Sequence, residues 1–349
     1  MKLLSRLLAL IVSAAPMTLA AQPPSQANNL HVSFIDVEGG QATLFVTPGG
    51  KSLLVDTGWP RQNGRDADRI VAEAHRAGLK RLDYVLITHY HTDHVGGVPQ
   101  LAARIPVDAF IDHGPLREMD HGVTEQGYAA YLETLATTKA HRLTLKPGDH
   151  LAMDGLELTT VAAAGQVIAA ALPGAGQPNT ACTTSPLHSP DAADAEQEEN
   201  VSSLGFVLTW GETRILDLGD LTWDKERELM CPLNKLGKID LLIVSHHGWD
   251  HSSSPALVDA IGAKLAVMDN GATKGGSPLT FQTLAAAPGH ASLWQLHYAE
   301  GAGALNSDPQ HIANRGGQDT GYLLRLIADK THGLSISKAV HPAFPGDRP

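Results

Sequence analysis

Short apolar segments recur along the chain, and most have the alternation or β-branched composition of strands. Between them lie segments in which apolar residues return every three or four positions, as on the buried face of a helix. Ile70, Val71, Ala74 and Ala77 show this helical spacing. We predict strands over 31–36, 42–47, 52–55, 84–88, 107–111, 156–162, 204–210, 214–218, 239–245, 264–268, 322–327 and 334–337. We predict helices over 66–77, 98–103, 126–138, 255–261 and 278–287.

The predicted strands fall into two blocks, each with its own helices. Residues 165–199 separate the blocks; they are rich in Gly, Pro, Ser, Asp and Glu and predict a long loop. Two β-rich halves that pack sheet against sheet, with helices outside, form a four-layer αββα sandwich. We therefore predict an α/β fold, with one such domain over about residues 30–340.

The overall composition limits the class of partner. Hydrophobic residues make up 43% of the 349 residues and charged residues 18%, a balance that allows a large core. The formal net charge of −11 argues against nucleic acid or an anionic membrane surface as a partner. We expect a small-molecule substrate, and the oligomeric state stays open.

The N-terminal residues have the pattern of a secretory signal peptide. Lys2 and Arg6 precede an apolar run over 7–15, and small residues follow at 18–21. We predict cleavage after about residue 21, no membrane span in the mature chain, and a periplasmic or secreted location. The alternative is that this segment is retained as an anchor.

Two cysteines remain, Cys182 and Cys231. In an exported protein they could pair, or they could be two separate thiols. The chain has no CxxC motif, so a thiolate-rich metal site is excluded.

The residues with the clearest chemistry follow the apolar strand at 84–88. His89, His91, Asp93 and His94 occupy six consecutive positions, and Gly96-Gly97 allows a tight turn after them. Imidazole and carboxylate ligands without thiolate suit zinc, manganese or iron. Four ligands are too many for one zinc that also keeps a position for water, so we expect two divalent metal ions. The alternative is a histidine-rich surface turn.

This H-x-H-x-D-H signature resembles that of the metallo-β-lactamase superfamily, and three further segments are similar in order. "LLVDTG" (53–58) resembles the motif whose aspartate, Asp56 here, braces the metal loop. "ILDLGD" (215–220) resembles the motif whose aspartate, Asp220, bridges the metals, and "LLIVSHHG" (241–248) the strand end that presents the last histidine. The resemblance covers about residues 30–340 and implies a metal-dependent hydrolase.

One motif differs from the family pattern. Many members place a third histidine upstream of the bridging aspartate, where this chain has Asn200 in "ENVSSLGF". The variation resembles the metallo domains of bacterial competence (DNA-uptake) proteins, as do "FIDVEGGQA" (34–42) and the "HHG…SSS" segment (246–254). His113 could replace the missing ligand, or it could lie behind the ligands or at the surface.

Two further ambiguities concern neighbouring residues. On extended backbone His246 and His247 would point to opposite sides, so we favour His246 as a metal ligand and place His247 as a pocket-lining catalytic candidate. Asp220 follows a glycine at a turn and is preferred over Asp217 as the bridging ligand. Asp217 is expected to form hydrogen bonds at the strand end.

Other polar residues near these motifs have weaker signals. Lys274 lies in a Gly-rich loop and could bind phosphate or carboxylate, although a single lysine is more often solvated. Ser253 or Ser254 is expected to cap the helix at 255. Trp294 and His297 could line the pocket, with core packing favoured for Trp294.

The two-metal interpretation predicts a metal-bound hydroxide that attacks a phosphorus or carbonyl carbon. Asp93 is the candidate for accepting or relaying the proton. The first hypothesis is an exported hydrolase of phosphodiesters or related phosphoesters. The alternatives are a β-lactamase or lactonase acting on cyclic amides or esters, and a non-catalytic metal-binding module.

Overall fold

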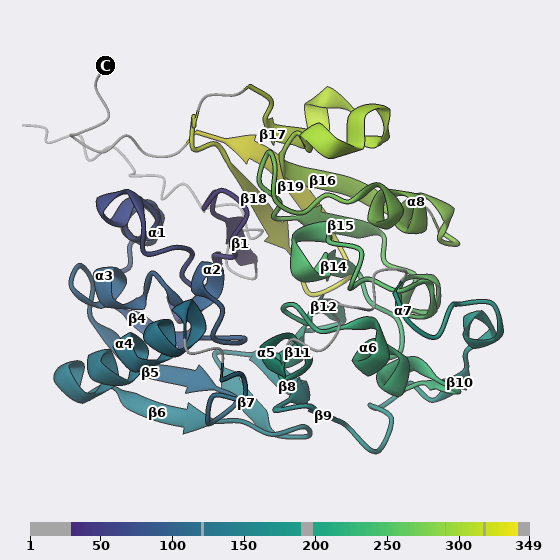
Figure 1. Ribbon diagram of the computed structural model, residues 1–349, viewed down its shortest axis with the longest axis horizontal. Coiled ribbons are helices and arrows are strands. Elements are labelled where there is room, and N and C mark those ends of the chain that lie inside the picture. The colour runs from purple at the N-terminus through teal and green to yellow at the C-terminus, as the bar shows by residue number, and fades with distance from the viewer. Residues whose placement is uncertain (1–28, 120–121, 190–197, 290, 317–318, 341–349) are drawn as a thin grey trace, which may run out of the picture.

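The computed structural model describes residues 29–119, 122–189, 198–289, 291–316 and 319–340. The predicted signal peptide, residues 1–21, lies outside this part of the chain. Two large sheets pack face to face, and helices cover both outer faces (Figure 1). Across the described segments, no helix combines the length and apolarity that crossing a membrane requires.

The first sheet has an antiparallel and a parallel half. Its strand order is β19-β18-β1-β2-β3-β4-β5-β6, and pairing becomes parallel from β3 onward. The strands are β1 (Leu30–Phe34), β2 (Thr43–Val46), β3 (Ser52–Val55), β4 (Leu82–Leu86), β5 (Val107–Asp112), β6 (His141–Thr144), β18 (Leu323–Ala328) and β19 (Leu334–Ala339).

The second sheet is built in the same way. Its order is β17-β16-β15-β14-β12-β11-β8-β7, with parallel pairing from β17 to β12 and β9 paired to β8. The strands are β7 (His150–Met153), β8 (Leu156–Ala163), β9 (Gln166–Val167), β11 (Gly205–Trp210), β12 (Thr213–Asp217), β14 (Leu241–Ile243), β15 (Leu265–Met268), β16 (Ser292–His297) and β17 (Ile312–Asn314).

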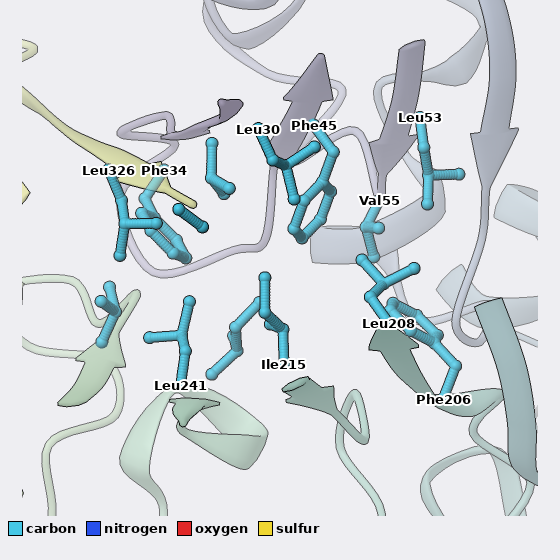
Figure 2. Close-up of a cluster of buried hydrophobic side chains, with 14 of the residues drawn as sticks. Leu30, Phe34, Phe45, Leu53, Val55, Phe206, Leu208, Ile215, Leu241 and Leu326 are labelled. Carbon is cyan, nitrogen blue, oxygen red and sulfur yellow. The ribbon is translucent and has the colours of Figure 1, made fainter. Parts of the chain in front are cut away.

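The inner faces of the two sheets form the central core. Alternate residues of each strand face inward, so Leu53 and Val55 of β3 join this core while Leu54 packs on the other side. Figure 2 shows side chains from the two sheets meeting in this layer: Leu30, Phe34, Phe45 and Leu326 from the first, and Phe206, Leu208, Ile215 and Leu241 from the second.

The outer faces are covered by separate groups of helices. The first sheet packs against α1 (Arg65–Arg76), α3 (Val98–Ala102) and α4 (Val123–Thr138). The second packs against α6 (Trp223–Met230), α7 (Pro255–Ile261) and α8 (Pro278–Ala286). In α1 the buried stripe is Ala67, Ile70, Val71 and Ala74, with Asp66 in the first turn, where a negative charge favours the helix dipole.

The predicted four-layer α/β sandwich is confirmed. The sequence pattern did not predict β6, β7, β16, β17 or α6. The segment 165–199 is not wholly irregular: it contains β9, β10 (Gln177–Pro178), which pairs with β13 (Leu233–Asn234), and the 3-10 helix η2 (Thr180–Thr183). Cys182 in η2 and Cys231 at the end of α6 form a disulfide, so the pairing alternative is correct.

The parallel halves of the two sheets place the polar motifs together. In the first sheet, Asp56 follows β3, and residues 89–94, which we call the histidine loop, follow β4. In the second sheet, Asp220 follows β12, the His246-His247 pair follows β14, and Lys274 follows β15. In open α/β sheets, sites form outside the carboxyl ends of parallel strands. Here the strand ends of both sheets contribute to one site.

Candidate metal centre

The histidine loop is braced by a buried aspartate. Asp56 accepts hydrogen bonds from Thr88 N (2.8 Å) and Thr88 Oγ1 (2.7 Å). Its Oδ2 also lies 2.7 Å from His94 Nδ1. This contact fixes the His94 ring and leaves Nε2 directed toward the other candidate ligands.

Four buried side chains form the first metal-binding candidate, which we call cluster A: Asp93, His94, Asp220 and His247. One ligand atom of each lies within 4.8 Å of the others. His94 Nε2 is 3.2 Å from Asp220 Oδ2, and His247 Nε2 is 3.1 Å from Asp93 Oδ2. Two carboxylates and two imidazoles at these separations could hold one divalent cation.

A second candidate, cluster B, consists of His89, His91 and Asp220. His89 Nε2 lies 3.0 Å from His91 Nδ1 and 3.7 Å from Asp220 Oδ2. Asp220 therefore belongs to both clusters, as a bridging ligand would. Asp217 instead accepts hydrogen bonds from Gln41 Nε2 (2.6 Å) and Gly219 N (2.9 Å), the strand-end role expected for it.

The adjacent histidines are placed differently from the sequence-based preference. His246 and His247 lie in the 3-10 turn η4 (Ser245–Gly248) with φ of 55° and 53°, so the assumption of extended backbone is wrong. Both rings approach Asp220, at 3.4 and 3.8 Å from its Oδ2. Only His247 joins cluster A, and its Nδ1 lies 3.4 Å from Asp269 Oδ1. The geometry favours His247 over His246 as a ligand.

His113 is not part of either cluster. Its Nε2 lies 3.1 Å from Glu199 Oε2, and Glu199 also accepts hydrogen bonds from Tyr90 N (3.1 Å) and Arg117 N (2.6 Å). Glu199, which the sequence analysis did not single out, thus supports the histidine loop from behind. Asn200 is buried beside it in α5 (Glu198–Val201).

The donor atoms of the clusters fit a bound cation. Burial opposes ionisation of Asp220, but the surrounding histidines, His246 foremost, hold its pKa well below the usual value. For Asp93, burial is likewise outweighed, mainly by Lys274, and the pKa is again well lowered. Among the described atoms, Asp220 Oδ1 is buried with no hydrogen-bond partner. Ionised buried oxygens beside imidazole nitrogens fit divalent metal ions.

Lys274 contributes a positive charge to the site. Its Nζ contacts Asp93 Oδ2 and lies 5.1 Å from the centre of the Trp59 ring. The site thus contains Lys274, for which the sequence left open either binding of a phosphate or carboxylate or simple solvation. Its signal in the sequence is its position in a Gly-rich loop after a parallel strand.

The remaining candidates have structural contacts. Ser254 Oγ caps α7 by accepting from Leu257 N at 3.3 Å, as predicted. Trp294 packs at the edge of the central core and stacks on His311, with ring centroids 4.5 Å apart. His297 Nε2 lies 2.7 Å from Asp36 Oδ1.

One cavity is lined by residues of the clusters, and a second shares Lys274 with it. The metal cavity, of about 240 Å³, is lined by His91, Asp93, Asp220, His246, Trp249, His251 and Lys274. The adjoining cavity, of about 450 Å³, shares Lys274 and also includes Trp59, Arg61, Thr273 and Asp319. A larger cavity of about 620 Å³, beside residues 174–184, is lined by no residue of either cluster.

Comparison with known families agrees with this architecture. Residues 36–165 match the model of the Metallo-beta-lactamase superfamily, a segment that contains the whole histidine loop. Residues 36–165 are therefore similar to the metallo-β-lactamase superfamily, as the motifs in this segment predicted. Placement in the competence branch stays a prediction.

Similarity to curated proteins is local. A hydroxyacylglutathione hydrolase of Stenotrophomonas maltophilia is 41% identical over 63 residues, 18% of this chain and 21% of that protein. The lactamase-like protein vrtG of Penicillium aethiopicum is 40% identical over 68 residues, 19% and 21% of the two chains. A metal-dependent hydrolase of Cupriavidus taiwanensis is 33% identical over 90 residues, 26% and 29%. The matches thus span less than a third of these relatives.

Solved structures resemble the chain more broadly but distantly. The metallo-β-lactamase fold protein YhfI from Bacillus subtilis has 15% identity and a TM-score of 0.40, covering 69% of this chain and 85% of YhfI. A diphosphatase from the PhnP family has 12% identity and a TM-score of 0.37 with the same coverage.

Proposed function

We propose that the protein is an exported metal-dependent hydrolase that acts on a phosphodiester or related phosphoester. The observation that carries the proposal is the pair of donor clusters that share Asp220 and have Lys274 beside them. A catalytic centre for an anionic substrate needs both parts: ligands for the metal ions and a positive charge for the substrate. A binding module would need neither the shared carboxylate nor the adjacent cation.

The side chains divide into ligands and supports. Cluster A would hold one divalent ion and cluster B a second, with Asp220 common to both. Such ions, when bound, act as Lewis acids and lower the pKa of water. Asp56 and Asp269 orient the imidazoles of His94 and His247, which keeps the ligand geometry fixed during the reaction.

The protein also prepares the surroundings of the reacting group. Lys274 would offset negative charge on a substrate oxygen, which is the main requirement in phosphoryl transfer. Asp93, which lies between His247 and Lys274, is the proposed group for relaying a proton rather than keeping it, because its pKa is held well below the usual value.

Export is proposed from the N-terminal pattern and is supported by the disulfide. Cys182 and Cys231 are bonded, and disulfides persist in oxidising compartments such as the periplasm and the extracellular space. Expression of the full chain followed by cell fractionation and N-terminal sequencing tests this part. Recovery of the uncleaved protein in the cytoplasm would contradict it.

Hydrolysis is tested by a substrate panel. The purified mature protein, loaded with zinc or manganese and assayed for metal content, is offered a bis-aryl phosphodiester, an aryl phosphomonoester, a chromogenic cephalosporin and a lactone. We expect turnover of the diester above all others. Cephalosporin or lactone turnover without diester turnover would overturn the proposed substrate class, and inactivity on all with two bound metals would favour a binding module.

A second candidate is hydrolysis of a carboxylic thioester. The local matches to hydroxyacylglutathione hydrolases favour it, because their names describe that reaction. Adding a glutathione thioester to the panel separates the candidates. Preference for the thioester would replace the phosphodiester proposal.

A further inference from the structure

The metal cavity and the adjoining cavity share one lining residue. Lys274 lines both the metal cavity of about 240 Å³ and the adjoining cavity of about 450 Å³. A substrate whose reacting group lies at the metal-ligand candidates therefore has space on two sides of Lys274. The chemistry of each side indicates what would fill it.

Close packing of its loop fixes the position of Lys274. Gly276 N donates to His247 O at 2.9 Å, and Gly271 N donates to Lys274 O at 2.9 Å. A Cβ at Gly39 would lie 2.9 Å from Lys274 Cβ, and one at Gly275 would clash with His247 O. Both glycines have positive φ, so neither backbone conformation nor space favours a larger residue. The loop thus holds Lys274 over Asp93.

The metal cavity has an aromatic wall. Trp249 is 37% exposed, although large aromatic residues are usually covered. Its ring stacks on that of His251 at 24°, with centroids 6.2 Å apart, and lies 6.3 Å from the His246 ring. A flat, partly exposed surface beside the clusters is suited to stacking on a planar group.

The adjoining cavity is polar and of mixed charge. The Arg61 guanidinium lies 4.2 Å from the centre of the Trp59 ring and donates to Glu38 O at 3.2 Å. Carboxylates of Glu38 and Asp319 also line it, as does the exposed Thr273. Donors and acceptors of both signs suit an arm with hydroxyl groups better than an apolar one.

We propose that the site recognises a two-armed phosphodiester whose anionic centre lies at Lys274, with a planar arm against Trp249 and His251 and a hydroxyl-bearing arm in the adjoining cavity. This inference rests on the proposed function and makes it more specific. A phosphomonoester has a single arm and would leave one of the two cavities unfilled.

The test measures binding of inert analogues, so it does not depend on turnover. Phenyl(2,3-dihydroxypropyl)phosphinate has both arms, methyl(phenyl)phosphinate lacks the hydroxyl-bearing arm, and dimethylphosphinate lacks both. None contains a hydrolysable P–O–C bond. Calorimetry on the metal-loaded wild-type protein should show that the two-armed compound binds about tenfold more tightly than methyl(phenyl)phosphinate. Equal affinities, or no binding of the two-armed compound, would overturn the proposal without any variant.

Three variants test where the two arms and the anionic centre of the bound compound lie. Thr273→Trp, at an exposed position, should abolish the preference for the two-armed compound without weakening methyl(phenyl)phosphinate. Trp249→Ala should weaken both phenyl compounds about tenfold and spare dimethylphosphinate. Lys274→Met should weaken all three about tenfold, whereas Lys80→Met, at an exposed position in the turn after α1, should change none.

Metal content and thermal melting show that each variant is folded and loaded. Unchanged binding in Thr273→Trp, Trp249→Ala or Lys274→Met would contradict the placement of the hydroxyl-bearing arm, the planar arm or the anionic centre, respectively. Tight binding of the two-armed compound by a protein that hydrolyses no diester would uphold this recognition and refute the proposed function. Diester turnover by a protein that shows none of these binding preferences would uphold the proposed function and refute the two-armed recognition.

Discussion

Asp269 acts on the metal centre through His247. Its Oδ1 lies 3.4 Å from His247 Nδ1, and both side chains are buried. A carboxylate behind a metal-binding imidazole fixes the ring and raises its basicity. At this distance the contact is electrostatic rather than a hydrogen bond, and with a cation at His247 Nε2 it would hold the ring of this cluster A residue in place.

We expect Asp269→Ala to weaken metal binding by cluster A about 10- to 100-fold, the effect typical of losing such a support. Competition against a chromophoric chelator measures it. Asp259→Ala, on α7 away from the clusters, is the matched control and should bind metal as the wild type does. Unchanged affinity in Asp269→Ala would show that His247 is oriented without this carboxylate.

Asn200 is the residue that the sequence motifs place where many similar proteins have a third histidine. Cluster B has only His89, His91 and the shared Asp220. If Asn200 occupies the place of the absent histidine, Asn200→His should tighten the weaker metal site about tenfold or more. Chelator competition measures the change, and Asn200→Gln controls for the larger side chain. Equal metal affinity in the wild type and both variants would show that Asn200 does not occupy the place of the absent histidine.

At the scale of single residues, the sequence predicted which residue types form the site better than it predicted the directions of their side chains. The H-x-H-x-D-H spacing located the histidine loop because residues so close in the sequence must lie together at the end of one strand. The preference for His246 over His247 rested on extended backbone, whereas both residues have a positive φ, which is uncommon for residues other than glycine. His113 was ambiguous because its partner, Glu199, is 86 positions away.

At the scale of elements, one buried glutamate joins α1 to the first sheet. Glu73 Oε1 accepts from Ser33 Oγ of β1 (2.6 Å), and Arg325 of β18 donates to both of its oxygens at 2.7–2.9 Å. Burial opposes ionisation, but these hydrogen bonds and Arg76 lower the Glu73 pKa to about 2. The helix is thereby fixed over strands from both ends of the sequence.

The lowered pKa gives a pH-dependent prediction. The stabilisation is fully present above the unfolded-state pKa of 4.5 and is lost as pH falls toward about 2. Glu73→Gln should lower the free energy of unfolding by about 3 kcal/mol at pH 7, with a smaller loss near pH 2.5. Urea denaturation of chelator-treated protein measures both. A pH-independent difference, or an equal effect of the exposed Glu133→Gln, would contradict the mechanism.

The sequence located elements wherever periodicity and turns agreed. Segment 66–77 became α1 because its apolar spacing matches a helix buried on one face. β6 was missed because all four of its residues are exposed, so it has no alternation to detect. In α6 the charged residues outnumber the buried apolar ones, Trp223, Leu229 and Met230, which obscured the helical period.

For the whole molecule, the metal-ligand candidates come from both layers of the sandwich. The histidine loop follows β4 of the first sheet, whereas Asp220 and His247 follow β12 and β14 of the second. An ion held by cluster A would therefore join the two sheets at the carboxyl ends of their strands. Such an ion binds the folded chain in preference to the unfolded one, and so it stabilises the sandwich by mass action.

Removing the metal should accordingly destabilise the fold. At an ion concentration 1,000 times the Kd, one site contributes about 4 kcal/mol, which corresponds to a fall in Tm of about 6 °C on chelation. Asp220→Ala removes the ligand common to both clusters, so its Tm should no longer respond to metal or chelator and its metal content should fall toward zero. Asp259→Ala should keep the full response. Two metals retained in Asp220→Ala would refute the bridging role, and a metal-independent Tm in the wild type would show that the ions do not join the sheets.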